Sequence, residues 1–100
     1  MKKLNRTNIN AYIQRGLVRR ELDNQRGAIA DGETAMQLAN EALQRDPNNP
    51  MLYYQRGMGF RLMRNYPQAA KDIQTGMQLG GDGNWDTDLQ AVKLEEKEGK

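Results

Sequence analysis

The stretch Tyr12-Ile13-Gln14-Arg15-Gly16 returns 41 residues later as Tyr53-Tyr54-Gln55-Arg56-Gly57. Positions 12–39 align with positions 53–80 without a gap, and twelve of these 28 pairs are identical. A repeat of this length is typical of stacked supersecondary units, each of which is too small to bury its own apolar face. The repeat therefore predicts an array of such units, and it directs the functional question toward binding surfaces rather than catalysis.

Apolar residues at helical spacing, separated by turn residues, predict helix–turn–helix twice and then one more helix. The expected signals are a cap at Thr7 or Asn8, a second helix from about Gln25 to Arg45, third and fourth helices opened by Pro50 and Pro67, and a capping box at Thr87 and Gln90. We therefore expect one all-α domain, 1–100, with repeat one at about 9–46, repeat two at about 50–80 and a capping helix at about 86–98.

The composition restricts the chemistry that the chain can perform. It has 15 basic and 13 acidic residues, a net charge of +2, and neither histidine nor cysteine. The commonest general base, the commonest metal ligand and every thiol are missing, so we expect no enzyme activity, no cofactor and no metal site. The mean hydropathy is −0.95, no apolar run approaches the roughly 20 residues of a membrane span, and no secretory signal is recognisable. These features favour a soluble cytoplasmic protein.

Several residues of the second unit follow the pattern of a known repeat family. They are Tyr53, Gly57, Phe60, Tyr66, Ala69, Ile73 and Gly76, and the first unit matches them with Tyr12, Gly16, Ala28 and Ala35. This pattern resembles the tetratricopeptide repeat, which implies helix pairs stacked into a short right-handed superhelix. The first unit departs from the pattern at Arg19, Gln25 and Gly32, and the period of 41 residues exceeds the family's usual length of about 34. The simplest account of the longer period is a second helix extended by two turns.

The resemblance implies that the first helix of each pair lines a concave groove for a peptide or helix of a partner protein. The implied groove residues are Asn10, Ile13, Leu17 and Arg20 from the first unit, and Met51, Tyr54, Met58, Arg61 and Leu62 from the second. Tyr53 and Phe60 are expected to fill the buried places, so Tyr54 and Arg61 are the expected surface contacts, and both are of types that often dominate binding energy. Alternatively, Ile13, Leu17, Met58 and Leu62 belong to the core. Some family members clamp a terminal carboxylate with Lys and Asn where Ile13 and Leu17 stand here, so no such clamp is expected.

Two further patterns have structural as well as functional interpretations. Arg15 and Arg56 are identical between the units and could grip an acidic partner, but ion pairs with Asp31 and Asp72 are the simpler expectation. Oxygen ligands alternate at 82, 84, 86 and 88 as at the start of a calcium loop, yet the central glycine and the closing glutamate of such a loop are missing. The carboxylates of Asp86 and Asp88 would instead stabilise the fifth helix, because they complement the positive end of its dipole.

The leading hypothesis is a protein-binding adaptor, and two alternatives remain open. Two repeats are fewer than the roughly three that usually form a stable array. A homodimer, or a designed or excised repeat fragment without a dedicated ligand, would therefore also fit the sequence. RNA binding is the further alternative, supported by the arginines at 15, 19, 20, 56, 61 and 64, although a net charge of +2 makes nucleic acid an unexpected partner.

Overall fold

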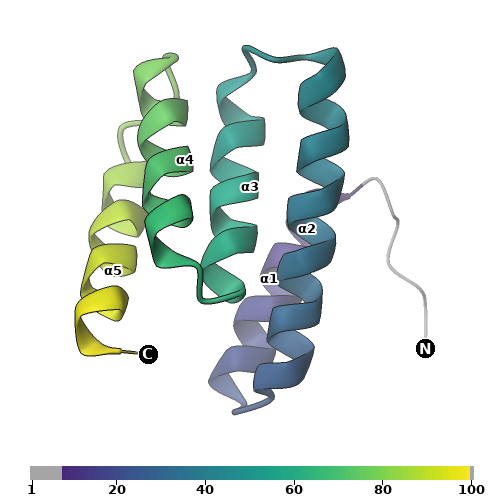
Figure 1. The fold of residues 1–100 in the computed structure, drawn as a ribbon, viewed down its shortest axis with the longest axis vertical. Coiled ribbons are helices and arrows are strands. Elements are labelled where there is room, and N and C mark those ends of the chain that lie inside the picture. The colour runs from purple at the N-terminus through teal and green to yellow at the C-terminus, as the bar shows by residue number, and fades with distance from the viewer. Residues whose placement is uncertain (1–7, 100) are drawn as a thin grey trace.

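A computed structural model describes residues 8–99, which form five α-helices and no β-strand (Figure 1). The helices are α1 (Ile9–Glu21), α2 (Gln25–Arg45), α3 (Pro50–Leu62), α4 (Tyr66–Gln78) and α5 (Trp85–Glu98). The all-α prediction is confirmed, and so are both predicted ends of α2. With 21 residues against 13 in α4, α2 also carries the extra turns that account for the long repeat period.

Both hairpin turns and the end of α4 use the same backbone arrangement. A residue just after each helix has a left-handed φ, which is 62° at Asp23, 65° at Arg64 and 97° at Gly80. The next residue returns a hydrogen bond to the last turn of the helix, as the Asn24 N–H does to the Arg19 carbonyl oxygen at 2.7 Å. This Schellman arrangement satisfies carbonyl groups that the helix end leaves free. Each helix therefore stops at a defined residue and the chain reverses sharply.

Asparagine side chains start the first three helices. The side-chain oxygens of Asn8, Asn24 and Asn49 each accept a backbone N–H from the first turn, at 3.0–3.1 Å. Such a cap satisfies one of the N–H groups that lack a partner inside the helix. The predicted cap at Asn8 is therefore confirmed, whereas Thr7 lies outside the described residues.

The fifth helix begins earlier than the sequence suggests. Asn84 is its N-cap and Trp85 is its first residue, so the predicted capping box at Thr87 and Gln90 is wrong. The Asp82 carboxylate accepts the Asn84 N–H at 2.8 Å, which starts the turn before Thr87 is reached. Thr87 consequently lies inside the first turn of the helix.

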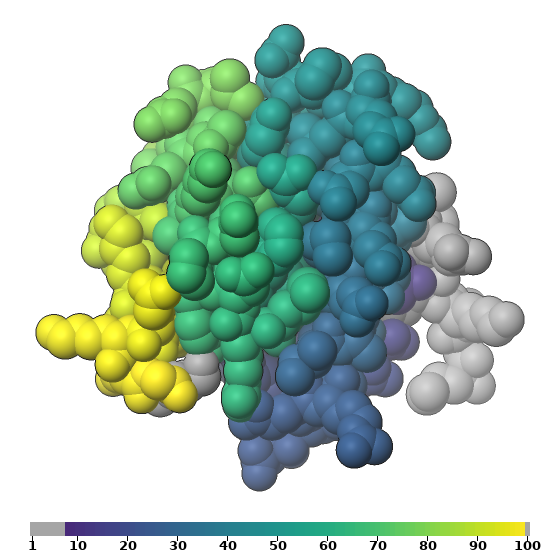
Figure 2. All heavy atoms as spheres, in the orientation of Figure 1, coloured from purple at the N-terminus to yellow at the C-terminus, as the bar shows by residue number. Residues whose placement is uncertain are grey.

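Consecutive helices pack side by side, and α2 and α3 approach closely at a pair of glycines. α2 contacts both α1 and α3, α3 contacts both α2 and α4, and α5 packs on α4. A Cβ atom at Gly32 would lie 2.6 Å from the Gly59 carbonyl oxygen, and one at Gly59 would lie 2.8 Å from that of Gly32. Gly32 and Gly59 therefore permit the two helix backbones to approach closely. Figure 2 shows the same face as Figure 1 with all heavy atoms drawn, and the atoms of α2, α3 and α4 form one continuous surface there.

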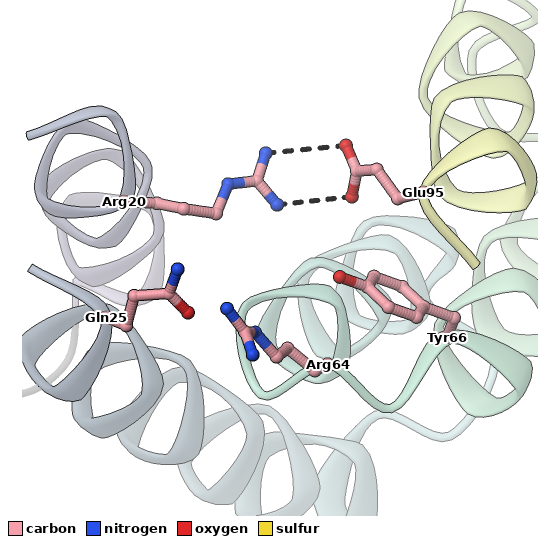
Figure 3. A pocket seen from close by; sticks show the side chains of 5 residues that line it. All are labelled: Arg20, Gln25, Arg64, Tyr66 and Glu95. Carbon is pink, nitrogen blue, oxygen red and sulfur yellow. Dashed lines mark hydrogen bonds and ion pairs between the residues drawn. The ribbon is translucent and has the colours of Figure 1, made fainter. Parts of the chain in front are cut away.

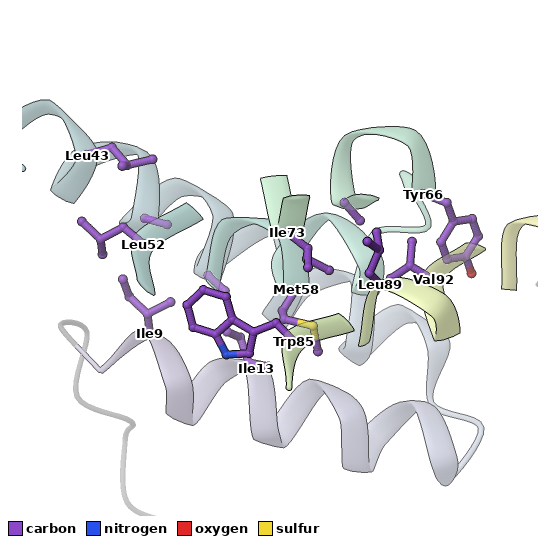
Figure 4. Close-up of a cluster of buried hydrophobic side chains, with 13 residues drawn as sticks. Ile9, Ile13, Leu43, Leu52, Met58, Tyr66, Ile73, Trp85, Leu89 and Val92 are labelled. Atoms are coloured by element: carbon purple, nitrogen blue, oxygen red, sulfur yellow. The ribbon is translucent and has the colours of Figure 1, made fainter. Parts of the chain in front are cut away.

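All five helices contribute to one hydrophobic core (Figure 4). Ile9 and Ile13 enter it from α1, and Trp85, Leu89 and Val92 enter it from α5. Val92 is fully buried, so α5 does more than shield the end of the array from solvent. In the described part of the chain, no helix has both the length and the apolar character that a membrane crossing needs.

The ion pairs predicted for the two repeated arginines are confirmed. Arg15 donates to the Asp31 carboxylate at 3.0 and 2.7 Å, and Arg56 donates to Asp72 at 2.8 Å from both Nε and Nη2. Both aspartates are almost fully buried. Each pair joins the two helices of one hairpin, which gives these arginines a structural role.

Candidate functional site

The structure places the predicted groove residues in different environments. Asn10 and Met51 are exposed, Leu17, Arg20 and Tyr54 are partly buried, and Ile13, Met58, Arg61 and Leu62 are buried. The exposed fractions of the three buried apolar residues are only 2–3%. Their burial favours the core interpretation of Ile13, Met58 and Leu62. The expectation that Arg61 is an exposed contact is wrong, because only 9% of it is accessible.

Side chains of helix α5 reach Tyr54 and Arg61 on the side of α3 that the resemblance assigns to the groove. The Trp85 ring of α5 stacks on the Tyr54 ring of α3, with their centroids 4.4 Å apart. The Tyr54 hydroxyl donates a hydrogen bond of 2.7 Å to Asp88, about one turn further along α5. Burial, together with this hydrogen bond to a carboxylate, raises the pKa of Tyr54 above its ordinary value, so the phenol stays protonated. Tyr54 is thus engaged by the chain itself.

Glu95 of α5 joins three helices through two arginines that occupy the same repeat position. Arg61 of α3 donates to its carboxylate from Nε at 3.0 Å and from Nη2 at 2.6 Å. Arg20 of α1 donates to the same carboxylate from Nη1 at 3.1 Å and from Nη2 at 3.5 Å. Arg61 Nη1 also lies 3.7 Å from Asp88. The repeat thereby places two guanidinium groups around one acid.

Charge pairing determines the protonation state of this junction of Arg20, Arg61 and Glu95. Burial alone would favour neutral Glu95, but the hydrogen bonds from Arg61 and the charges of Arg61 and Arg20 lower the pKa of Glu95 below its ordinary value. Burial also disfavours the charged form of Arg61, yet hydrogen bonding to Glu95 and the charge of that carboxylate raise the pKa of Arg61. Glu95 and Arg61 are therefore both charged at neutral pH.

A pocket of about 440 Å³ opens beside this junction, at the end of the molecule where both hairpin turns lie (Figure 1). We call it the turn-end pocket, and its lining residues are Arg20, Gln25, Arg64, Tyr66 and Glu95. Figure 3 shows the Gln25 amide, the Arg64 guanidinium and the Tyr66 hydroxyl directed toward the same space beside the Arg20–Glu95 pair. The helices α1, α2, α4 and α5 and the α3–α4 turn each contribute one side chain to this recess.

The turn-end pocket has an excess of positive charge. Its one carboxylate, that of Glu95, is paired both with Arg20 and with the buried Arg61. Among the described residues, no carboxylate lies within 4.0 Å of the Arg64 guanidinium. Burial and the charge of Glu95 raise the pKa of Tyr66, so its hydroxyl is not ionised at neutral pH. A ligand with anionic oxygens would meet charge-assisted hydrogen-bond donors here.

Arg64 stands at a backbone position where arginine is unusual. Its φ of 65° is left-handed, and the equivalent residues of the other two turns are Asp23 and Gly80. Aspartate, asparagine and glycine adopt this conformation readily, whereas other residues incur a cost of about 1 kcal/mol. The Arg64 N–H donates to the Arg61 carbonyl oxygen at 3.0 Å, which helps to fix the turn. The Arg64 side chain therefore projects into the pocket from a constrained and mildly strained backbone.

Sequence reasoning misses most of this pocket. Of its five lining residues, only Arg20 belongs to the predicted groove. Glu95 pairs with Arg20 and Arg61 across 75 and 34 residues of chain, and no periodic pattern marks such an acid. Gln25 and Tyr66 did carry a signal, because they occupy equivalent positions of the two units and flank the turns that meet at this end.

The candidate calcium loop, 82–88, consists of the end of the α4–α5 connection and the first turn of α5. Asp86 and Asp88 lie in the first turn of this helix, where acidic side chains complement the positive end of the helix dipole. Asp88 accepts the Tyr54 hydroxyl. In residues 8–99, no group of three or more potential ligands is placed to hold a metal ion together.

The turn-end pocket gathers several hydrogen-bond donors around one paired acid. Two guanidinium groups converge on it with an amide and a hydroxyl, and its acid is neutralised by two arginines. Comparisons of the chain with protein-family models, with curated proteins and with solved structures found no match.

Proposed function

We propose that the chain is a protein-interaction module, built from two tetratricopeptide-like hairpins and a capping helix, that binds a segment of a partner protein at the turn-end pocket. The observation that carries the proposal is the pocket itself, an accessible recess with more cationic than anionic groups. Its volume of about 440 Å³ falls in the range of roughly 300–1,000 Å³ that is usual for binding sites.

Exposed apolar side chains gather at the same end of the molecule. Of the six large hydrophobic residues that are exposed in the described chain, Val18, Leu22, Ile29 and Leu94 lie in the halves of α1, α2 and α5 nearest the pocket, or directly after α1. Met51 and Leu79 lie at the opposite end. Apolar contacts near a polar recess are what a protein partner needs for affinity combined with orientation.

The proposed site differs from the groove that the resemblance implies. Three side chains of α5 contact Tyr54 and Arg61 of α3, namely those of Trp85, Asp88 and Glu95. A partner therefore cannot bind Tyr54 and Arg61 while α5 is docked. Leu17 and Arg20 remain partly accessible on α1. We therefore place the partner at the turn end of the molecule and not along the centre of α3.

Site-specific photocrosslinking tests this placement. A benzoylphenylalanine at position 22 replaces Leu22, which is 75% exposed at the pocket end, and one at position 79 replaces Leu79, which is 41% exposed at the other end. In source cells we expect a discrete adduct with another protein from position 22 and none from position 79. Adducts of equal yield from both positions, or none from position 22, would contradict the proposed site.

Self-association is a second candidate function, favoured by the outer side of α1. Val18 and Leu22 lie one helical turn apart and are 54% and 75% exposed, and no described helix covers them. Two copies could bury this stripe against each other. Crosslinking of the purified 11.4-kDa chain from position 22 distinguishes this case, because a homodimer would give an adduct of twice that mass.

The arginines that made RNA an alternative are mostly engaged within the chain. Arg15 and Arg19 pair with Asp31, Arg56 pairs with Asp72, and Arg20 and Arg61 pair with Glu95. Phosphate contacts along a strand need several free cations, and each contact neutralises one phosphate. Arg64 alone of the six has no carboxylate partner among the described residues, which favours a local anion site over a nucleic-acid surface.

A further inference from the structure

We propose that the turn-end pocket binds a phosphoryl group carried by a serine or threonine side chain of the partner segment, with Arg64 and Arg20 as its ligands. This inference rests on the proposed function and deepens it, because it makes recognition of the partner dependent on phosphorylation. It draws on three properties of the pocket: a guanidinium that no described carboxylate pairs with, a second guanidinium that can be released from its acid, and a net positive charge that a phosphoryl group matches.

Arg64 supplies the first guanidinium. It points into the pocket in Figure 3, and no described carboxylate pairs with it. Asparagine or glycine would suit its left-handed φ of 65° better, as the aspartate and glycine in the two equivalent turns illustrate. Backbone strain of this kind persists where the surroundings maintain it, and it is frequent at ligand-binding positions. The arginine is thus better explained by a ligand than by the needs of the turn.

Arg20 supplies the second guanidinium, since it is the more weakly held partner of Glu95. Its two hydrogen bonds to the carboxylate measure 3.1 and 3.5 Å, against 3.0 and 2.6 Å for those of Arg61. The Arg20 side chain is also 30% exposed, whereas that of Arg61 is 10% exposed. If Arg20 turns toward a ligand, Arg61 still holds Glu95 through two hydrogen bonds. No buried acid is left unpaired by this movement, which keeps its cost low.

Charge and donor number favour a phosphoryl group over a carboxylate. When Arg61 neutralises Glu95, Arg20 and Arg64 leave two positive charges in the pocket. A phosphorylated side chain carries a charge of about −1.5 to −2 and three acceptor oxygens, whereas a carboxylate has one charge and two oxygens. Two bidentate guanidinium groups and the Gln25 amide offer more donors than a carboxylate can accept. The volume of about 440 Å³ leaves room for the side chain that carries the group.

Binding of short peptides to the full chain tests the inference. The probes are acetyl-Ala-Ala-phosphoserine-Ala-Ala-amide, the same peptide with glutamate in place of phosphoserine, and inorganic phosphate. Titrations are followed by the ¹H–¹⁵N signals of the arginine Nε–H groups, which report directly on Arg20 and Arg64. We expect saturable binding of the phosphopeptide that shifts both signals, with an affinity about tenfold or more above that of the glutamate peptide.

Three variants make the test specific. Arg64→Gln should weaken the phosphopeptide about tenfold or more, because it removes a charge-assisted, bidentate ligand. Arg45→Gln is the matched control: it removes an arginine that is exposed on α2 and has no carboxylate partner in the described chain, so the affinity should not change. Arg64→Asn should bind as weakly as Arg64→Gln while unfolding at a urea concentration no lower than wild type, since asparagine suits the left-handed turn. This variant separates loss of the ligand from loss of the fold.

The outcomes that overturn the inference are equally defined. Equal affinity for the glutamate peptide would make the pocket a carboxylate site, and binding of inorganic phosphate without the phosphopeptide would make it a site for a free anion. Equal binding by Arg64→Gln and Arg45→Gln would remove Arg64 from the site. In each case a specific photocrosslink from position 22 would still support a protein-interaction module. Loss of that crosslink together with intact phosphopeptide binding would contradict the proposed function and leave the phosphoryl site in place.

Discussion

At the scale of single residues, a constellation of tyrosine, arginine and aspartate accounts for several of the identities between the two units. The Arg56 guanidinium lies over the Tyr53 ring, 5.5 Å from its centroid, and donates to Asp72 with two bonds of 2.8 Å. Arg15 repeats this arrangement over Tyr12 at 5.7 Å. A tyrosine and an arginine three positions apart on one helix thus clamp an acid on the next helix. The same three residue types recur because each hairpin needs the same clamp.

Removal of one arginine from this clamp should be costly. We expect Arg56→Met to lower the free energy of unfolding by about 2–3 kcal/mol, because it leaves the Asp72 carboxylate buried without its charged donor. Urea unfolding followed by circular dichroism at 222 nm measures the change. Arg45→Met is the control, and an exposed substitution of that kind should stay within about 0.5 kcal/mol of wild type. The double variant Arg56→Met/Asp72→Leu should recover part of the loss, and equal losses in the single variant and the control would refute the clamp.

Glu95 should make the stability of the chain depend on pH. Its pKa is about 4.5 in an ordinary environment and lower in the folded chain, so the ionised acid stabilises the fold above about pH 4.5. This contribution is lost as the pH falls through the lower, folded pKa. We therefore expect Glu95→Gln to be less stable than wild type at pH 7, and the difference to shrink progressively below about pH 4.5. Urea midpoints between pH 7 and pH 3 measure this, with Glu96→Gln as the exposed control. A difference that stays constant down to pH 3 would show that the charge of Glu95 is not responsible.

At the scale of helical elements, the crossing of α2 and α3 depends on the absence of side chains. The resemblance places a large apolar residue where Gly32 stands, and Ile73 fills the equivalent position of the second unit. Gly59 lies opposite Gly32, so the two backbones meet directly there. The departure from the repeat pattern in the first unit is therefore compensated in the second. A single-unit comparison cannot reveal this, because the compensating residue lies on another helix.

The substitution Gly59→Ala sets helix propensity against packing. Propensity alone predicts a gain of about 1 kcal/mol in an α-helix. The new Cβ would lie 2.8 Å from the Gly32 carbonyl oxygen and 2.9 Å from the Met36 nitrogen, and backbone atoms cannot yield as side chains do. We expect packing to prevail and the free energy of unfolding to fall by about 1–3 kcal/mol. Gly83→Ala is the control, since a Cβ atom added there would meet no neighbouring atom within 4 Å. A thermal melt in which Gly59→Ala is the more stable protein would sink the argument.

At the scale of the whole molecule, the sequence predicts the helices well and their closure poorly. The five helices and their turns follow from local signals, because capping, proline and glycine act within a few residues. The repeated ion pairs follow from the identities between the two units. The position of α5 depends instead on its packing against α4 and on side-chain hydrogen bonds with α3 and α1 that span 34 and 75 residues. The sequence predicts a capping helix there, but it does not predict that Trp85, Asp88 and Glu95 of this helix reach side chains of α3. Tertiary packing therefore determines where α5 lies. Because α5 engages Tyr54 and Arg61, the candidate site is the turn-end pocket and not the middle of α3.

The docking of α5 on the rest of the molecule also predicts how the molecule unfolds. Trp85 is the only tryptophan, it lies on α5, and its stacking on Tyr54 makes its fluorescence a probe of whether α5 is docked. Because Leu89 and Val92 belong to the same core as residues of α1, we expect the fluorescence and circular dichroism transitions in urea to coincide. Glu95→Gln weakens the link from α5 to α1 and α3. In this variant we expect the fluorescence transition to occur at a lower urea concentration than the circular dichroism transition, because α5 detaches first.

If the fluorescence transition of wild type occurred at a lower urea concentration than the circular dichroism transition, α5 would not unfold together with the rest of the molecule. Helix α5 would then detach while the two hairpins remain folded, and the Tyr54, Met58 and Arg61 side chains would become accessible. A partner could then compete with α5 for the surface that the repeat resemblance implies, in addition to the turn-end pocket. The coincidence of the two transitions is therefore the measurement that decides between a fixed cap and a displaceable one.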